Sequence, residues 1–171
     1  MGESTQVPPG RPGQRVAIRE ATAADTEELV RLRLALQREV GDLPEDADPT
    51  PQAAAIRRYF EETLPSGEFR AWVADAGGRL VACSGLVLLR RPPSRRNLAG
   101  WEAYLMNMYT EPDWRGRGLA TALLCACVAY AQTQTPARRI RLHATAAGRP
   151  VYERAGFVLA NAAVPEMVLS W

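Results

Sequence analysis

The feature that most restricts the fold of this chain is a glycine-rich loop between a β-rich run and a long apolar stretch. The loop reads Arg-Gly-Arg-Gly at residues 115–118, after the run 101–110 and before a helix expected at about 118–132. Glycine allows positive φ values and lets the backbone approach a ligand closely. The exposed N–H groups of such a turn, the positive end of the helix and two arginines together favour a diphosphate. A solvent-exposed Arg-Gly turn is the alternative for so short a segment.

The rest of the chain alternates between β-rich and helical patterns. We expect the elements in the following order: strand 16–19, helix 25–40, helix 51–64, strands 69–76, 80–89 and 101–110, helix 118–132, strand 139–144, helix 148–154, and strands 157–159 and 166–169. Gly77-Gly78-Arg79 is the turn of a β-hairpin. An early hairpin followed by alternating strands and helices predicts a mixed sheet with helices on both faces, in an α/β or α+β fold.

The length of 171 residues suits one domain with a single core. The Pro- and Gly-rich residues 1–14 are expected to form a flexible tail, and residues 15–171 the domain. The first residues lack the apolar segment of a secretory signal, and no run approaches the roughly 20 apolar residues of a membrane-spanning helix. We therefore expect a cytoplasmic protein without a membrane partner.

Composition argues against several function classes. The net charge of +2 does not indicate a nucleic-acid partner, which would need basic and aromatic residues clustered on one face. The Gly-Lys-Ser/Thr signature of phosphate-loop nucleotidases is absent. Cys83, Cys125 and Cys127 lie in apolar runs, so we expect buried free thiols in a reducing compartment. A disulfide or a metal site is not expected.

The segment around the glycine-rich loop resembles the central motif of the GNAT acetyltransferases. That motif is a strand, a proline-containing turn, an Arg-x-x-Gly-x-Gly/Ala loop and a helix, and residues 104–124 follow it. Arg115, Gly118 and Ala120 stand at its signature positions. The six loop residues alone are a weak signal, but their context makes the resemblance specific.

A second motif further along the chain resembles the Tyr-x-x-x-Gly-Phe motif of the same family. The matching residues are Tyr152, Gly156 and Phe157. The two motifs come in the family's order, and the expected elements follow that order over residues 15–171. The resemblance implies a mixed, mostly antiparallel sheet of six to seven strands with about four helices. It also implies that the strand ending at Thr110 and the one starting near Arg139 splay apart at the centre.

The resemblance implies acetyl-CoA as cosubstrate, bound in the V between the splayed strands, without a metal. The family's main-chain contacts to the acetyl and pantetheine groups would map to Met108, Tyr109 and Thr110. An extended pantetheine that pairs with a strand edge needs only main-chain groups. The diphosphate contacts would map to a continuous run of seven residues: Arg115, Gly116, Arg117, Gly118, Leu119, Ala120 and Thr121.

Acetyl transfer to an amine requires loss of an amine proton, donors for the oxyanion and an acid for the leaving thiolate. The resemblance places Tyr152 as the acid, with packing of its helix as the alternative, and a backbone N–H near Met108 or Tyr109 as oxyanion donor. Three bases stay open. Glu102 stands where one branch of the family, similar to the histone acetyltransferases, has a catalytic glutamate. The alternative is that Glu102 is a strand residue that faces water. His143 is the only histidine and is either a base or structural, and ordered water is the third candidate.

The acceptor is the least defined part. The resemblance implies that the first two helices, their connecting loop and the late strands select it. The loop contains four acidic residues: Asp42, Glu45, Asp46 and Asp48. They would attract a cationic amine or simply be solvated. The arginines of residues 90–96 would suit an anionic substrate or the 3′-phosphate of CoA. Thr145 stands where many relatives have asparagine, and its hydroxyl can still donate a hydrogen bond.

The function that these observations favour is an N-acetyltransferase acting on a primary amine of a small molecule, by direct attack in a ternary complex. A protein or peptide N-terminus or a lysine is the alternative acceptor, and a non-catalytic acyl-CoA-binding module is the alternative function. The apolar residues 166–171 would suit pairing with a second copy. The sequence is therefore compatible with a homodimer.

Overall fold

The computed structural model describes residues 15–95 and 97–160. The tail expected at 1–14 and the strand expected at 166–169, with the homodimer contact inferred from 166–171, lie outside these residues. The elements come in the following order: β1 (Ala17–Glu20), a 3₁₀ turn (Ala23–Asp25), α1 (Thr26–Glu39), α2 (Thr50–Ser66), β2 (Phe69–Asp75), β3 (Leu80–Arg90), β4 (Trp101–Thr110), a second 3₁₀ turn (Pro112–Trp114), α3 (Leu119–Gln134), β5 (Ile140–Arg141) and α4 (Arg149–Arg154).

The five strands of the described part form one sheet in the order β1-β2-β3-β4-β5. The first three pairs are antiparallel and β4 pairs with β5 in parallel. This confirms the mixed, mostly antiparallel sheet, and the hairpin turn at 77–79 joins β2 to β3 as predicted. No helix among the described residues is long and apolar enough to cross a bilayer.

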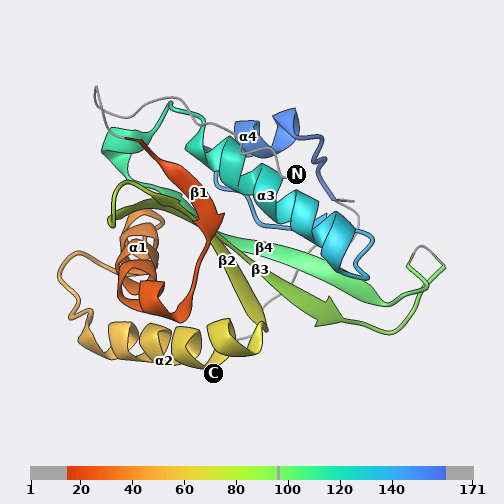
Figure 1. Ribbon diagram of the computed structural model, residues 1–171, viewed down its shortest axis with the longest axis horizontal. Coiled ribbons are helices and arrows are strands. Elements are labelled where there is room, and N and C mark those ends of the chain that lie inside the picture. The colour runs from red at the N-terminus through yellow and green to blue at the C-terminus, as the bar shows by residue number, and fades with distance from the viewer. Residues whose placement is uncertain (1–14, 96, 161–171) are drawn as a thin grey trace.

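Helices cover both faces of the sheet, with α1 and α2 on one side and α3 on the other (Figure 1). Consecutive strand residues point to opposite faces, so Trp72 enters the α3 core and Val73 the core of α1 and α2. The core beneath α1 and α2 includes Leu29, Leu32, Phe60, Phe69 and Val73. The core beneath α3 includes Trp72, Leu86, Leu105, Leu123 and Leu124. Burial of these apolar surfaces is the main stabilising contribution.

Two of the expected strands differ from the structure. The strand expected at 139–144 is limited to Ile140 and Arg141, because β5 pairs with β4 only through Ala103–Ile140 and Tyr104–Arg141. Residues 157–159, expected to be a strand, have no regular structure, and no described strand pairs with them. A β conformation needs such a partner to satisfy its backbone groups, so the apolar pattern alone was misleading there.

The early termination of β5 opens the sheet. β4 continues beyond Tyr104 to Thr110, while the chain after Arg141 leaves the sheet on its way to α4. Among the described strands, the second half of β4 therefore has β3 on one side and none on the other. This is the splayed pair that the family resemblance implies, and it creates the candidate site.

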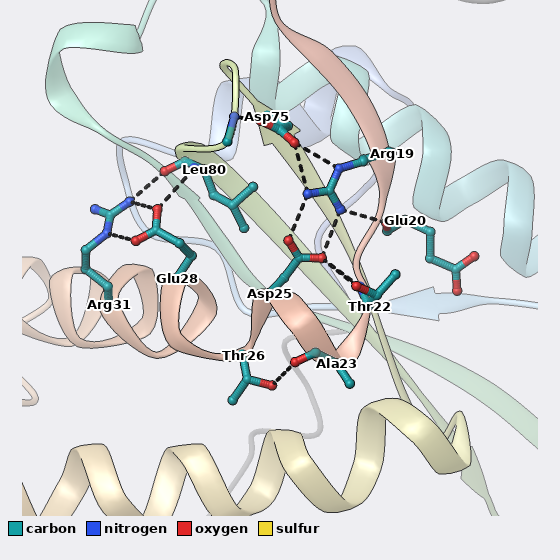
Figure 2. A network of polar contacts seen from close by, with 11 residues as sticks. Arg19, Glu20, Thr22, Ala23, Asp25, Thr26, Glu28, Arg31, Asp75 and Leu80 are labelled. Atoms are coloured by element: carbon teal, nitrogen blue, oxygen red, sulfur yellow. Dashed lines mark hydrogen bonds and ion pairs between the residues drawn. The ribbon is translucent and has the colours of Figure 1, made fainter.

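A group of polar contacts at the start of the domain ties β1, α1 and β2 together (Figure 2). The Arg19 guanidinium lies between Asp25, at 2.8 Å, and Asp75, at 3.0 Å. The Asp25 carboxylate also accepts the backbone N–H of Thr22 at 2.8 Å, which caps the first turn of the helical segment. Arg19 thus pairs with a residue that lies 56 positions away in the chain.

The cysteines are free thiols, as expected, but they are not all buried. Cys83 and Cys127 are buried, whereas Cys125 is exposed. The prediction was wrong for Cys125 because residues two apart on a helix point in different directions, and Cys127 takes the inward one. Burial raises the pKa of the Cys83 and Cys127 thiols to about 12, so both stay protonated.

Candidate active site

A cavity of about 910 Å³ lies at the open edge of β4. It is bounded by β4, the glycine-rich loop and the start of α3, by the segment from His143 to Arg154, and by α1 with the loop that follows it. Its volume is that of a site for a cofactor-sized ligand. Nine residues of the expected cofactor site line it: Met108, Tyr109, Thr110, Arg115, Gly116, Gly118, Leu119, Ala120 and Thr121.

The glycine-rich loop has the conformation that its sequence requires. Gly116 and Gly118 have φ values of 73° and 76°, in the left-handed region that other residues rarely adopt. No atom lies within 4 Å of where a Cβ would stand at either position, so the conformation and not the space requires glycine. Gly118 is also the N-cap of α3, and the first N–H groups of a helix have no partner within the helix. The loop and the helix start therefore present backbone donors to the cavity.

The two arginines of the loop take different positions. The Arg115 side chain lines the cavity, donates from Nε to the Thr110 carbonyl at 3.0 Å and forms an ion pair with Glu39 at the end of α1. The Arg117 side chain does not line the cavity. Its guanidinium stacks 4.9 Å from the Trp114 ring centroid and donates to the Asp113 carbonyl. The structure thus brings Arg115, and not Arg117, to the site.

A β-bulge in β4 decides which of its backbone groups face the cavity. Asn107 and Met108 together oppose a single residue of β3, Ser84. Asn107 has a φ of 54° and is the only non-glycine residue in the described part with positive φ. Its side-chain Oδ1 accepts a hydrogen bond from Arg33 of α1 at 2.7 Å, and its carbonyl accepts one from the Cys83 thiol at 3.2 Å. Contacts from α1 and from the neighbouring strand β3 thus hold the strained residue.

The bulge changes which backbone groups of β4 point toward the open side and which point toward β3. Before it, the backbone N–H of Ala103 points toward the β5 side and donates to the Arg139 carbonyl. After it, the N–H of Glu111 points toward β3 and donates to Val81. Backbone groups alternate along a strand, so those of Tyr109 point toward β3 as those of Glu111 do. The backbone groups of Met108 and Thr110 therefore face the open side. These are the groups that an extended ligand in the cavity would meet.

Tyr152 lies in the cavity wall on α4, where it is 7% exposed. Its ring packs edge-on against Phe157 with the centroids 6.0 Å apart, so the Tyr and Phe of the second motif meet. Burial raises the pKa of the Tyr152 phenol to about 12. The side chain is therefore a neutral hydroxyl, able to donate, over the whole ordinary pH range.

Glu102 lies apart from the other candidate residues. It is 1% exposed on β4, does not line the cavity, and forms ion pairs with Arg139, Arg91 at 3.1 Å and Arg141 at 3.9 Å. The alternative that it faces water is wrong, since arginines enclose it. The arginines come from β5 and from the loop before β4, so this carboxylate joins the two strands where they are still paired.

His143 does line the cavity, two residues after the end of β5. Its Nδ1 atom forms a short hydrogen bond with the Tyr104 hydroxyl, and Tyr104 lines the same cavity. Sequence analysis missed Tyr104, although the register that pairs it with Arg141 places it near His143. Thr145, found where relatives have asparagine, accepts the backbone N–H of Gly148, the residue just before α4, at 3.1 Å.

The remaining wall comes from the last two turns of α1 and from Val40, the residue that follows the helix. Arg33, Leu36, Gln37 and Val40 line the cavity, and their spacing of three or four residues places them on one helix face. That spacing is the signal that could have identified them. Of the four acidic loop residues, Asp42 alone lines the cavity. The arginines of residues 90–95 do not line it.

Comparison with known proteins agrees with this geometry. A family model described as "Acetyltransferase (GNAT) family" matches residues 34–157. A predicted acetyltransferase from Clostridium acetobutylicum, solved with acetyl-CoA, is 29% identical, with a TM-score of 0.78 over 90% of this chain and 96% of that one. A GCN5-related N-acetyltransferase from Ralstonia eutropha JMP134 is 28% identical, with a TM-score of 0.73 over 91% and 98% of the two chains.

More distant structures share the fold. A ribosomal-protein-alanine N-acetyltransferase from Brucella melitensis is 21% identical, with a TM-score of 0.63 over 91% of this chain and 99% of that one. No curated protein matches the sequence. The family match covers well over half of the chain and includes both motifs, the splayed strands and the cavity between them. The chain therefore belongs to the GNAT family of acetyltransferases.

Proposed function

We propose that this enzyme transfers the acetyl group of acetyl-CoA to a primary amine of a small molecule, by direct attack in a ternary complex. As a GNAT acetyltransferase it uses acetyl-CoA as cosubstrate. The observation that carries the proposal is the single cavity that joins backbone donors of the glycine-rich loop, the open edge of β4 and the Tyr152 hydroxyl. These supply, in order, a site for the diphosphate, for the thioester and for the leaving sulfur.

Cofactor binding in this proposal depends on backbone groups more than on side chains. The pantetheine arm extends along β4 and pairs with the outward groups of Met108 and Thr110, as an added strand would. The diphosphate lies at the start of α3, where Gly116 and Gly118 expose N–H groups and the helix dipole favours an anion. Arg115 adds a positive charge at the same end of the cavity.

The reaction joins the amine nitrogen to the thioester carbon and breaks the bond between that carbon and sulfur. The N–H of Met108, which faces the open side after the bulge, donates to the oxyanion that forms between these steps. A CoA thiol has a pKa near that of cysteine, ~8.5, well below the value for Tyr152. Tyr152 therefore stabilises the leaving thiolate by donating a hydrogen bond, and does not end the step as a phenolate.

The amine must lose a proton before or during attack. His143 is the base that the geometry favours, because it lines the cavity while Glu102 does not. An imidazole is the side chain that most often serves as a general base in enzymes. The hydrogen bond of His143 with Tyr104 orients the ring. A water in the same cavity is the alternative carrier of this proton.

Calorimetric titration of the full chain with acetyl-CoA, and separately with CoA, tests the proposal. We expect saturable one-to-one binding of both. The double variant Arg115→Ala with Gly118→Asp should abolish it, because a carboxylate would then face the diphosphate. Absence of binding to the native chain at millimolar acetyl-CoA would contradict the proposal. Binding of equal strength to the double variant would show that the loop is not the diphosphate site.

A further inference from the structure

Arg33 is a partly buried cation on the wall of the cavity, and it has no carboxylate partner among the described residues. Six arginines in the described part of the chain are partly buried: Arg19, Arg31, Arg33, Arg57, Arg70 and Arg117. Four of them form ion pairs with Asp or Glu. Arg117 stacks on Trp114 and lies outside the cavity, so Arg33 alone combines partial burial, a place in the cavity wall and no acidic partner.

The contacts of Arg33 leave most of its hydrogen-bonding capacity unused. One donor, Nη1, reaches Asn107 Oδ1 at 2.7 Å, and a guanidinium has five N–H donors. Removing a cation from water is unfavourable unless an anion compensates for the lost hydration. A planar guanidinium fits a carboxylate through two parallel hydrogen bonds, which a point charge such as lysine cannot provide. The side chain is therefore suited to a carboxylate that arrives with a ligand.

The position of Arg33 limits where that carboxylate lies in the ligand. Its guanidinium contacts Asn107, the residue just before Met108, whose N–H faces the open side where the acetyl carbonyl would bind. Adjacent Cα atoms are about 3.8 Å apart, so a carboxylate on Arg33 lies close to the reacting carbon. A group so placed belongs to the acceptor and not to the diphosphate, which lies beyond Thr110 at the start of α3.

We propose that the acceptor is an amino acid or a close analogue, in which a carboxylate lies a few bonds from the amine that is acetylated. Arg33 binds this carboxylate and so determines specificity. The inference rests on the proposed function, because it assigns the second substrate of the same site. The acidic residue Asp42 in the cavity wall would also attract the positively charged amine as it enters.

A purely structural role is the competing explanation, since Arg33 also holds the strained Asn107. The two roles make different predictions about substrates. If Arg33 only stabilises the bulge, its loss should slow the reaction with every amine to the same degree. If it binds a carboxylate, its loss should affect amines that carry one and leave the others nearly unchanged.

The test is a thiol-release assay on the full chain with acetyl-CoA and the twenty protein amino acids, each compared with its amide. The amide keeps the shape of the amino acid and removes the carboxylate charge. We expect the native enzyme to acetylate at least one amino acid with a kcat/KM about 10- to 100-fold above that of its amide, the range for charge-assisted hydrogen bonds. Arg33→Gln should bring this ratio close to one, chiefly through KM, and Arg33→Lys should restore part of it.

Two variants serve as controls. Arg38→Gln removes the same charge from an exposed position of α1 outside the cavity and should leave the ratio unchanged. Asn107→Gly removes the hydrogen bond to Arg33 while glycine accepts the positive φ. It should lower kcat for acid and amide alike without changing their ratio.

Each outcome bears on one proposal only. Amides acetylated as well as their amino acids by the native enzyme, or no amino acid acetylated although acetyl-CoA binds, would overturn the amino acid inference. An unchanged ratio in Arg33→Gln, with acetyl-CoA affinity retained, would overturn it as well. Failure of the native chain to bind acetyl-CoA would instead overturn the proposed function.

Discussion

Tyr152 and Glu102 are both almost fully buried, yet their surroundings suit them to different tasks. Tyr152 lies in a cavity wall where burial raises the pKa of its phenol and keeps it a neutral donor. Glu102 is enclosed by Arg91, Arg139 and Arg141 and has no access to the cavity. A buried carboxylate with several cationic partners is a structural group, because withdrawing it from those partners for a proton transfer would be strongly unfavourable.

Replacement of Tyr152 by phenylalanine tests its role at the leaving sulfur. We expect kcat to fall about 100-fold, the lower end of the range for loss of a general acid or base. The affinity for acetyl-CoA should stay nearly unchanged. With the pKa raised to about 12, the donor form persists as pH rises. Below pH 10 the rates of the native and Tyr152→Phe enzymes should therefore depend on pH in the same way. Steady-state kinetics between pH 6 and 10 and calorimetry would measure both effects, and equal kcat values would remove Tyr152 from the mechanism.

Some residues of the site could be predicted from the sequence and others could not. Tyr152 and the loop glycines belong to short motifs, in which spacing along the chain fixes the position. The environment of Glu102 depends on arginines up to 39 positions away, and no local pattern shows them. Arg33 and Tyr104 were missed for the same reason, since each becomes part of the site only when α1 and the segment after β5 approach β4.

At the scale of elements, the site depends on two interruptions of regular structure. β5 stops after pairing with two residues of β4, and the bulge at Asn107 then turns the groups of Met108 toward the space that β5 has left. Neither interruption would be sufficient alone. Without the first there would be no opening, and without the second the backbone groups at Met108 would be bonded to β3.

The positive φ of Gly118, at the start of α3, predicts how its substitution affects stability. Alanine there should lower the free energy of unfolding by about 1–2 kcal/mol, because an L side chain is disfavoured at positive φ even where space is available. Asparagine tolerates this conformation better, so Gly118→Asn is the matched variant and should be destabilised less. Urea unfolding of the three proteins would measure the order. Equal stability of the alanine and native proteins would contradict the argument from backbone conformation.

The sequence predicted elements well where the local pattern was strong. β4 has the predicted bounds, the hairpin turn is where glycines were found, and α3 starts one residue after the predicted position. The predictions for 139–144 and 157–159 failed because pairing with a distant strand, and not the local alternation, decides whether a short apolar run becomes a strand. The splay itself came from the family resemblance, since residue patterns do not show where two strands separate.

At the scale of the whole molecule, the sheet has to hold α1 at a fixed distance from β4, because the cavity lies between them. Three contacts far apart in sequence do this. The Arg19 group ties β1 to the start of α1 and to β2 (Figure 2). Arg31 joins α1 to Glu111, just after β4, and Arg115 joins the glycine-rich loop to Glu39. Removing any of them should therefore affect stability and the geometry of the site together.

The Arg19 group predicts how stability depends on pH. Hydrogen bonds from Arg19 lower the pKa of Asp25 to about 2, from a usual value near 4. A carboxylate with a lowered pKa stabilises the folded protein above its unfolded pKa, and this contribution is lost as pH falls through the folded value. Asp25→Asn should thus lower the free energy of unfolding at pH 7 by about 1 kcal/mol, reduced by solvent screening because Arg19 is 37% exposed.

Urea unfolding of the native and Asp25→Asn proteins between pH 7 and pH 2 would test this dependence. The difference in free energy should be constant above about pH 5 and shrink steadily between pH 4 and pH 2, as the native carboxylate becomes protonated. Glu27→Gln removes a carboxylate from an ion pair with Arg57 that is largely solvent-exposed, and it should cause no measurable loss. A difference for Asp25→Asn that persists unchanged at pH 2 would mean that the aspartate acts by its shape and hydrogen bonds alone. Its charge would then have no part in holding α1 against the sheet.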